Sequence, residues 1–259
     1  MPPVRKRPRS YDPVRTRAAV LTQFGSVRTA VEALGPAELA LPTRIGQWTV
    51  RELAAHMALA ADGVVRAIER PEPAKAEVGL LGWPAAYGGP SDEDTGEPAA
   101  AGPLDELYPR VADRLARALA DTPGHRIVPT RVGAMRLEDF LVTLAVELTV
   151  HTDDLNDAGL SVPHDRQALA ACTRLLADAL AVKAPGGSVE VRVPPYAVVQ
   201  CVEGPRHTRG TPPNVVETDP LTWIRLATGR TEWAEALGAA RVSASGERAD
   251  LTALLPVLG

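Results

Sequence analysis

The sequence predicts an N-terminal four-helix bundle followed by a smaller α+β domain. Apolar residues recur at helical spacing in four segments before residue 163, and short strand-like runs alternate with helices after it. No strand pattern is recognisable between the first four helices. Because 259 residues suffice for two ordinary domains, we divide the chain into a bundle over residues 13–164 and an α+β domain over residues 165–259.

End signals and periodicity locate the helices of the predicted bundle. The second helix opens with a capping box, in which the Thr49 hydroxyl and the Glu52 carboxylate satisfy early backbone amides. The first begins at Asp12-Pro13, a favourable helix start. The four helices cover about residues 13–35, 49–70, 103–120 and 137–156.

A long segment rich in proline, glycine and acidic residues joins the second and third helices, over residues 71–103. It contains the aromatic residues Trp83 and Tyr87. Loops of this length are often lids or binding loops. A lid over a functional site and a flexible surface insertion are therefore equal alternatives.

The pattern changes after Pro163, where β-branched runs and short helices alternate. A helix over residues 166–182 leads to a Gly-Gly turn and two strands around a Pro-Pro turn. This order predicts an α+β domain. Its further elements are strands near residues 189–193, 197–202, 215–218 and 241–244, and helices near 219–229, 232–237 and 247–255.

Composition and charge exclude several classes of protein. The net charge of -4 argues against a nucleic-acid-binding domain, and no stretch approaches the roughly 20 apolar residues of a membrane span. Cys172 and Cys201 cannot form a disulfide framework, so we expect two small buried side chains in a cytoplasmic protein. Residues 1–12 are basic; we expect a disordered tail, with a transit peptide or nucleic-acid arm as the alternative.

Three side chains from two helices form a candidate metal site. Glu147 and His151 are four residues apart and share one helical face, while His56 flanks the apolar stripe of another helix. Two imidazoles and one carboxylate can bind a divalent ion and leave positions open. By spacing alone, ordinary hydrogen-bonded helix residues are the favoured alternative. Asp154 and Arg51 are second-sphere candidates, or else surface charges.

The two segments that carry these residues resemble one known family. Residues 42–56 and 147–155 are similar to motifs of the mycothiol-dependent maleylpyruvate isomerase family, a branch of the DinB-like metal-binding helix bundles. The resemblance implies that His56, Glu147 and His151 bind zinc or another divalent ion. One departure is Asp153, where relatives often carry a larger, frequently aromatic residue.

The C-terminal half resembles the sterol carrier-like domain that accompanies this bundle in relatives. The similar runs are residues 219–230 and 244–251, so the resemblance covers nearly the whole chain after residue 12. It implies a DinB-like bundle followed by a sterol carrier-like domain. The remaining histidines, His125, His164 and His207, fall in polar segments and are predicted to be solvated.

Two classes of function follow. In the first, the metal binds a small-molecule thiol such as mycothiol as thiolate, and the thiolate attacks an electrophilic substrate in an isomerase or transferase. In the second, the C-terminal domain carries an apolar, lipid-like ligand, with simple core packing as the alternative role of the same residues. Either protein would be a monomer or a homodimer. The candidate groove residues are Val198, Val199, Trp223, Ile224 and Leu254.

Overall fold

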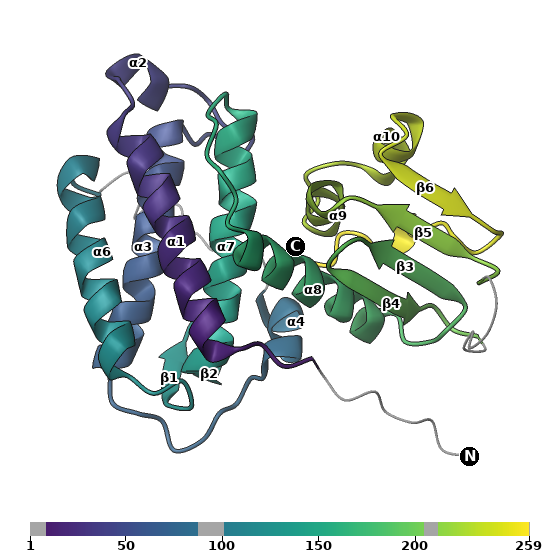
Figure 1. Cartoon of the computed structure of the whole chain (residues 1–259), viewed down its shortest axis with the longest axis horizontal. Helices are drawn as coiled ribbons and strands as arrows, with labels where there is room; N and C mark the ends of the chain where they lie inside the picture. Colours follow the sequence, from purple (N-terminus) through teal and green to yellow (C-terminus); the bar gives the residue numbers. More distant parts are fainter. Residues whose placement is uncertain (1–8, 88–100, 205–211, 259) are drawn as a thin grey trace.

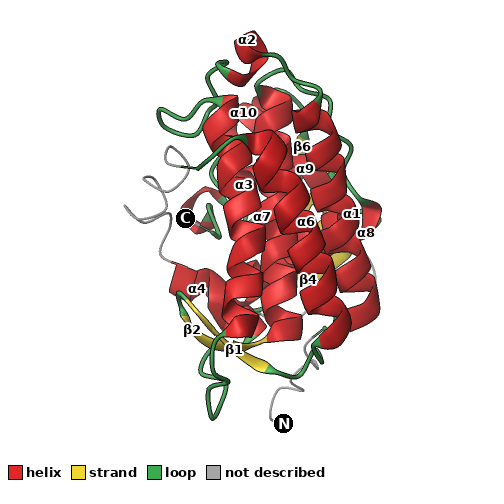
Figure 2. Ribbon diagram, turned by 90° about the vertical axis from the view of Figure 1, so that its left-hand side faces the viewer, coloured by secondary structure: helices red, strands yellow, loops and turns green. Residues whose placement is uncertain are grey.

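The computed structural model describes residues 9–87, 101–204 and 212–258, and its helical bundle lies beside a smaller part that contains a sheet (Figure 1). The predicted fold class is confirmed. Figure 2 shows the bundle helices running side by side. The helix α1 packs against α6 and α7, and α3 packs against the same two helices. The bundle consists of α1 (Pro13–Glu32), α3 (Val50–Glu69), α6 (Leu104–Asp121) and α7 (Leu137–Asp157).

Helix α7 is enclosed by protein on nearly every side. From Leu141 to Leu155 every residue is buried except Glu147, which is half-buried. One face of α7 contributes to the bundle core, and the opposite face, with Val146 and Val150, joins a second core shared with the C-terminal domain. Polar side chains on such a helix need partners, because an unpaired buried polar group costs several kcal/mol.

The C-terminal part contains a four-stranded sheet in the order β4-β3-β5-β6. The central pair β3–β5 is parallel and the outer pairs are antiparallel. Helix α8 (Arg166–Lys183) packs against both α7 and β4, so it lies between bundle and sheet (Figure 1). The other elements are β3 (Val189–Val193), β4 (Ala197–Cys201), β5 (Val215–Thr218), α9 (Pro220–Ala227), α10 (Trp233–Gly238) and β6 (Val242–Ser245).

Side chains of this sheet alternate as expected for strands with one covered face. In β3, Val189, Val191 and Val193 are buried and the residues between them are half-buried. Cys172 of α8 and Cys201 of β4 are free and fully buried in the same core. Burial raises the pKa of the Cys201 thiol to about 11 and that of Cys172 still further. The prediction that both are small buried side chains is confirmed.

The prediction that no strand lies among the bundle helices is wrong. Strands β1 (Ile127–Thr130) and β2 (Gly133–Arg136) form an antiparallel hairpin between α6 and α7. Gly133 has a φ of +118° at the turn, a conformation that favours glycine. Strands of four residues are too short to show a clear alternation of apolar and polar positions.

Three further segments differ from the prediction. The loop over residues 71–103 contains a 3₁₀ turn, η1 (Leu80–Gly82), and a short helix, α4 (Trp83–Tyr87), before residues 88–100, which are not described. A short helix, α2 (Pro36–Leu39), was not predicted. The predicted helix over residues 247–255 is only the 3₁₀ turn η2 (Thr252–Leu254), because the Asp250 carboxylate accepts hydrogen bonds from the Thr252 amide and hydroxyl and fixes a local turn.

The described part of the basic N-terminal segment is anchored to the protein. Arg9 donates a hydrogen bond to Asp178 Oδ1 at 3.0 Å, and Asp12 caps α1 through the Val14 and Arg15 amides. Residues 1–8 lie outside the described part of the chain. Among the described helices, none has both the length and the apolar character that a bilayer crossing requires.

Candidate metal centre

The capping box predicted for the second helix is present and fixes where α3 begins. The Thr49 amide donates to Glu52 Oε2 at 2.7 Å, and the Glu52 amide donates to Thr49 Oγ1 at 3.4 Å. Both bonds satisfy amides that a helix start leaves unpaired. This start places His56 in the second turn of α3, on the side that faces α7.

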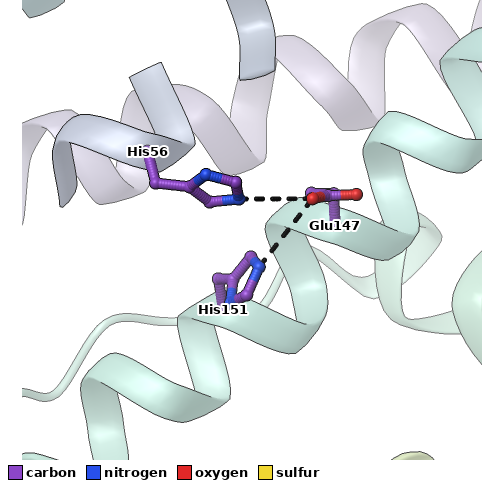
Figure 3. A group of neighbouring side chains, drawn as sticks. All are labelled: His56, Glu147 and His151. Carbon is purple, nitrogen blue, oxygen red and sulfur yellow. Dashed lines mark hydrogen bonds and ion pairs between the residues drawn. The ribbon is translucent and has the colours of Figure 1, made fainter. Parts of the chain in front are cut away.

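The side chains of His56, Glu147 and His151 converge between α3 and α7 (Figure 3). Glu147 Oε1 lies 3.3 Å from His56 Nε2 and 3.9 Å from His151 Nε2. One ligand atom from each residue falls within 4.8 Å of the others. Their side chains are only 15%, 18% and 10% exposed, so the group is largely shielded from solvent.

A carboxylate behind His151 sets which ring nitrogen faces this cluster. His151 Nδ1 lies 2.8 Å from Asp154 Oδ2. An ionised carboxylate only accepts hydrogen bonds, so Nδ1 carries the proton and donates it. In the neutral ring, Nε2 then keeps its lone pair on the side of Glu147.

Two ring contacts position His56. The Trp48 ring lies with its centroid 5.0 Å from that of the His56 imidazole, and the His151 imidazole is 5.1 Å away at 88°. Trp48 precedes the capping box directly, so the same helix start orients both residues. The indole thus covers one side of the His56 ring.

Adjacent aspartates on α7 carry an ion-pair network across to the C-terminal domain. Arg230 donates to both oxygens of Asp154 at 3.0 and 2.9 Å, and Arg225 donates to both oxygens of Asp153 at 2.8 and 2.6 Å. From the loop before α3, Arg44 donates to both aspartates at 2.6 Å. Asp153 and Asp154 are 2% and 0% exposed, so these pairs are desolvated.

These partners keep both buried carboxylates ionised. Burial alone would raise the pKa of Asp154, but hydrogen bonds from His151 and Arg230 more than offset it and hold the pKa well below its usual range. For Asp153, burial is likewise outweighed by hydrogen bonds from Arg225 and Arg44, and its pKa is lowered. The network therefore keeps an anion directly behind His151.

The cluster lies on the wall of a cavity of about 680 Å³. Helices α3 and α7 supply two walls, the β1–β2 hairpin and α4 supply Met135, Trp83 and Tyr87, and the C-terminal domain supplies Thr228 and Arg230. This volume is within the usual range for small-molecule sites. The cavity is thus built from both domains.

The structure places the other predicted residues as follows. Trp83 is buried and Tyr87 half-buried, and both line the cavity near α7. Arg51 instead donates to the carbonyl oxygens of Ala101 and Gly102. Of the candidate groove residues, Val198 is 49% exposed, whereas Val199, Trp223 and Ile224 are buried in the second core and Leu254 is packed against it.

The predicted solvation of His164 is wrong. Both ring nitrogens are buried without a hydrogen-bond partner among the described residues, and burial lowers the pKa of the ring below its ordinary range. His125 is exposed, as predicted, and His207 lies outside the described residues.

Sequence reasoning assigned no site role to Arg44, Trp48 or Arg230. Gly229 and Arg230 suggested only a turn, and the helix α9 does end there. The sequence did contain one signal for such partners, the adjacent pair Asp153-Asp154 inside an apolar helix. Two buried carboxylates need cationic side chains from other segments to compensate their charge. Local periodicity cannot say which arginines supply them.

Comparisons with known proteins agree with this architecture. Residues 20–156 match the family model of the "Mycothiol maleylpyruvate isomerase N-terminal domain", and residues 165–257 match that of a "Bacterial SCP ortholog". The crystal structure of the mycothiol-dependent maleylpyruvate isomerase, and that of a histidine-to-alanine mutant of it, are each 16% identical to this chain with a TM-score of 0.58. Each alignment covers 91% of this chain and 93% of that chain, and at this identity it shows the fold. No curated protein matches the chain.

Proposed function

Because the chain belongs to the mycothiol maleylpyruvate isomerase N-terminal domain family, we propose that it is a metal- and thiol-dependent isomerase or transferase of the cytoplasm. His56, Glu147 and His151 of the bundle, residues 13–164, bind one divalent ion, and residues 165–259 close the cavity beside it. The observation that carries the proposal is the convergence of these three side chains on the wall of a large cavity.

The donor atoms present fit a zinc-like ion. Metal–ligand bonds of about 2.0–2.2 Å in a tetrahedral site place neighbouring ligand atoms about 3.3–3.6 Å apart. The two distances from Glu147 Oε1, 3.3 and 3.9 Å, are close to this value. Two imidazole nitrogens and one carboxylate oxygen suit zinc and similar ions. Three protein ligands leave a position for an exchangeable group, which is typical of catalytic sites.

When bound, such an ion lowers the pKa of a coordinated thiol and so favours the thiolate. The residues of this chain prepare the site for that role. Asp154 holds the His151 ring with its Nε2 lone pair toward Glu147, and Trp48 covers the His56 ring. Hydrogen-bonded orientation of this kind raises ligand basicity and affinity for metals.

The thiol is a small-molecule cosubstrate, such as the mycothiol named for the family and its structural neighbours. The thiol gives up its proton, and its sulfur forms a bond to an electrophilic carbon of the substrate while the π bond at that carbon breaks. In an isomerase the π bond re-forms as the sulfur leaves and the thiol is returned, whereas in a transferase a leaving group departs from the carbon with its electron pair and the sulfur stays in the product. The cavity lining also includes the aromatic ring of Trp83, and the helix α4 that carries it is a candidate lid segment.

A cobalt-substituted sample tests this proposal. Addition of a small thiol should produce a thiolate-to-cobalt charge-transfer band in the wild type. His151→Ala should lose both cobalt binding and the band, and His125→Ala, a change at an exposed histidine, should keep both. If no thiol changes the cobalt spectrum, and lipid-like probes bind through residues 165–259 instead, the carrier function is favoured.

A further inference from the structure

The cavity is elongated along the two helices that hold the candidate metal ligands. On α3 its lining runs from His56 through Gly63 to Arg70, at intervals of seven residues on one face. At 1.5 Å per residue this stripe is about 21 Å long, and the lining from Phe140 to His151 on α7 is about 16 Å long. The cavity is therefore a corridor with the cluster at one end.

The other end lies at the C-terminus of α3, beside the β1–β2 hairpin. Arg126, which precedes β1, donates to the carbonyl oxygens of Ile68 and Arg70 at 3.1 and 3.2 Å. The hairpin contributes Thr130 and Arg131 to the lining there. This end is far from His56, because Arg70 follows it by almost four helical turns.

Arginines line this distal end. The Arg66 guanidinium folds over Gly63, with Nη2 3.9 Å from the position that a Cβ on Gly63 would occupy. Arg131 lies over the Tyr87 ring at 5.2 Å from the centroid. Within the described chain, Arg70 has no side-chain partner, and Glu147 is the one acidic residue of the lining, at the opposite end.

The acidic residues of α3 and of the segment after it already have partners at this end. Asp62 and Glu69 pair with Arg114 of α6, and Asp62 also forms an ion pair with Arg66 at 3.7 Å. Glu72 accepts a hydrogen bond from the Ile127 amide, and Glu77 accepts one from the Ala134 amide. Arg66 thus shares Asp62 with Arg114, and Arg70 has no acidic partner among the described residues, so the positive charge of these two arginines favours an added anion.

Between the two ends the lining is mainly apolar, although Thr143 of α7 also contributes to it. Ala60, Val64 and Ala67 of α3 face the corridor, and Phe140 and Leu144 of α7 line it from the other helix. The small residues on α3 leave room for an extended aliphatic group. A ligand that fits the cluster end, the apolar middle and the arginine end of the corridor has an apolar body and one anionic end.

We propose that the corridor binds an elongated amphipathic anion, with its carboxylate or phosphate at Arg66 and Arg70 and its aliphatic body along Ala60 to Ala67. The other end of the ligand reaches His56, Glu147 and His151. Only the idea that this end reacts there rests on the proposed function. The binding of the anionic end depends on the arginines alone.

Calorimetric titration of the metal-free full chain tests the inference with linear alkanoates and linear alkyl phosphates of increasing length. Affinity should rise with chain length to a maximum and then fall, because the corridor has a finite length. Alcohols of matched length should bind more weakly. Comparison of the two acid series identifies which anionic group the arginines prefer, and added salt should weaken both.

Variants locate the two parts of the ligand. Arg70→Gln should weaken the best acid about three- to tenfold, because a charged hydrogen-bond partner at an exposed position is lost. Arg110→Gln, at an exposed position on α6 outside the cavity, should leave affinity unchanged. Gly63→Leu places a side chain in the corridor and should weaken long acids more than short ones.

Three results would overturn the inference: no acid binds, alcohols bind as tightly as acids, or Arg70→Gln and Arg66→Gln both leave the affinity for acids unchanged. His151→Ala separates this inference from the proposed function. If the wild type fails to bind metal but both it and His151→Ala bind acids, the corridor proposal is supported and the metal-site proposal is not. If metal binds and acids do not, the opposite holds.

Discussion

Arg230, in the turn that follows α9, donates two hydrogen bonds to Asp154 of α7, at 2.9 and 3.0 Å, while Asp154 also accepts from His151. One carboxylate thus joins the candidate metal site to the C-terminal domain. The Asp154 side chain is fully buried and that of Arg230 is 18% exposed, so the pair is largely removed from water. A buried pair of this kind destabilises the fold strongly when one partner is lost.

Replacement of Asp154 should affect the metal site more than replacement of its neighbour. Asp154→Asn removes the charge behind His151 and should lower metal affinity about 10–100-fold. Asp153→Asn is the matched control, because it loses the charged acceptor for Arg225 and has no contact with His151. Both variants should lose about 3 kcal/mol of unfolding free energy. Equal metal affinities in isothermal titration would contradict the positioning role of Asp154.

Removal of metal should lower the melting temperature of the wild type. An ion present at about 100 times its dissociation constant adds about 2.7 kcal/mol to the unfolding free energy. For a chain of this size the corresponding shift is about 5–10 °C. Thermal melts with and without a chelator measure it. His151→Ala should abolish the chelator effect, and a response equal to that of the wild type would place the ion elsewhere.

His164 should make the fold less stable in acid. Its pKa is lowered by burial, so below about pH 6.5 the unfolded chain takes up a proton more readily than the folded protein. The unfolding free energy therefore falls as the pH drops below that value, until the folded-state pKa is passed. His164→Leu should remove this part of the pH dependence in denaturant titrations, because it has no titrating ring.

At neutral pH the same substitution should leave stability unchanged or raise it by about 1 kcal/mol, because it removes two buried nitrogens without partners. His125→Leu, at an exposed position, should leave the pH dependence of the wild type in place. An unchanged pH dependence in His164→Leu would show that other groups cause it.

Two glycines should respond to alanine in opposite directions. Gly186 has a φ of +155°, and a Cβ there would clash with the Val202 carbonyl oxygen, so Gly186→Ala should cost at least about 3 kcal/mol. Gly25, inside α1, has no neighbouring atom within 4 Å of its Cβ position. Gly25→Ala should therefore stabilise the protein by about 1 kcal/mol. Equilibrium unfolding of the two variants checks both signs.

Local patterns in the sequence predicted the parts of the site that depend on a single helix. The capping box at Thr49 and Glu52 marked the start of α3, and the four-residue spacing of Glu147 and His151 placed both on one face of α7. Their convergence with His56 requires α3 and α7 to pack with one particular axial alignment of the two helices. The family resemblance supplied that link, because helical periodicity carries no information on register.

Contacts between distant segments were the part that sequence could not predict. Arg225 and Arg230 follow their aspartate partners by 72 and 76 residues, so no local motif joins them. The buried position of His164 depends on the packing of both domains around it. The β1–β2 hairpin is too short for a recognisable alternation, although it forms one wall of the cavity.

The contribution of Thr228, Arg230 and Leu258 to the cavity has a consequence for how such a protein can diversify. The three side chains that converge at the candidate metal centre all belong to the bundle, whereas part of the surface that a ligand meets belongs to the other domain. Mutations at Thr228 or Leu258 can therefore change the cavity wall and leave the three candidate ligands in place, whereas a mutation of Arg230 also removes hydrogen bonds to Asp154. Descendants of one ancestral chain could acquire new specificities by this route.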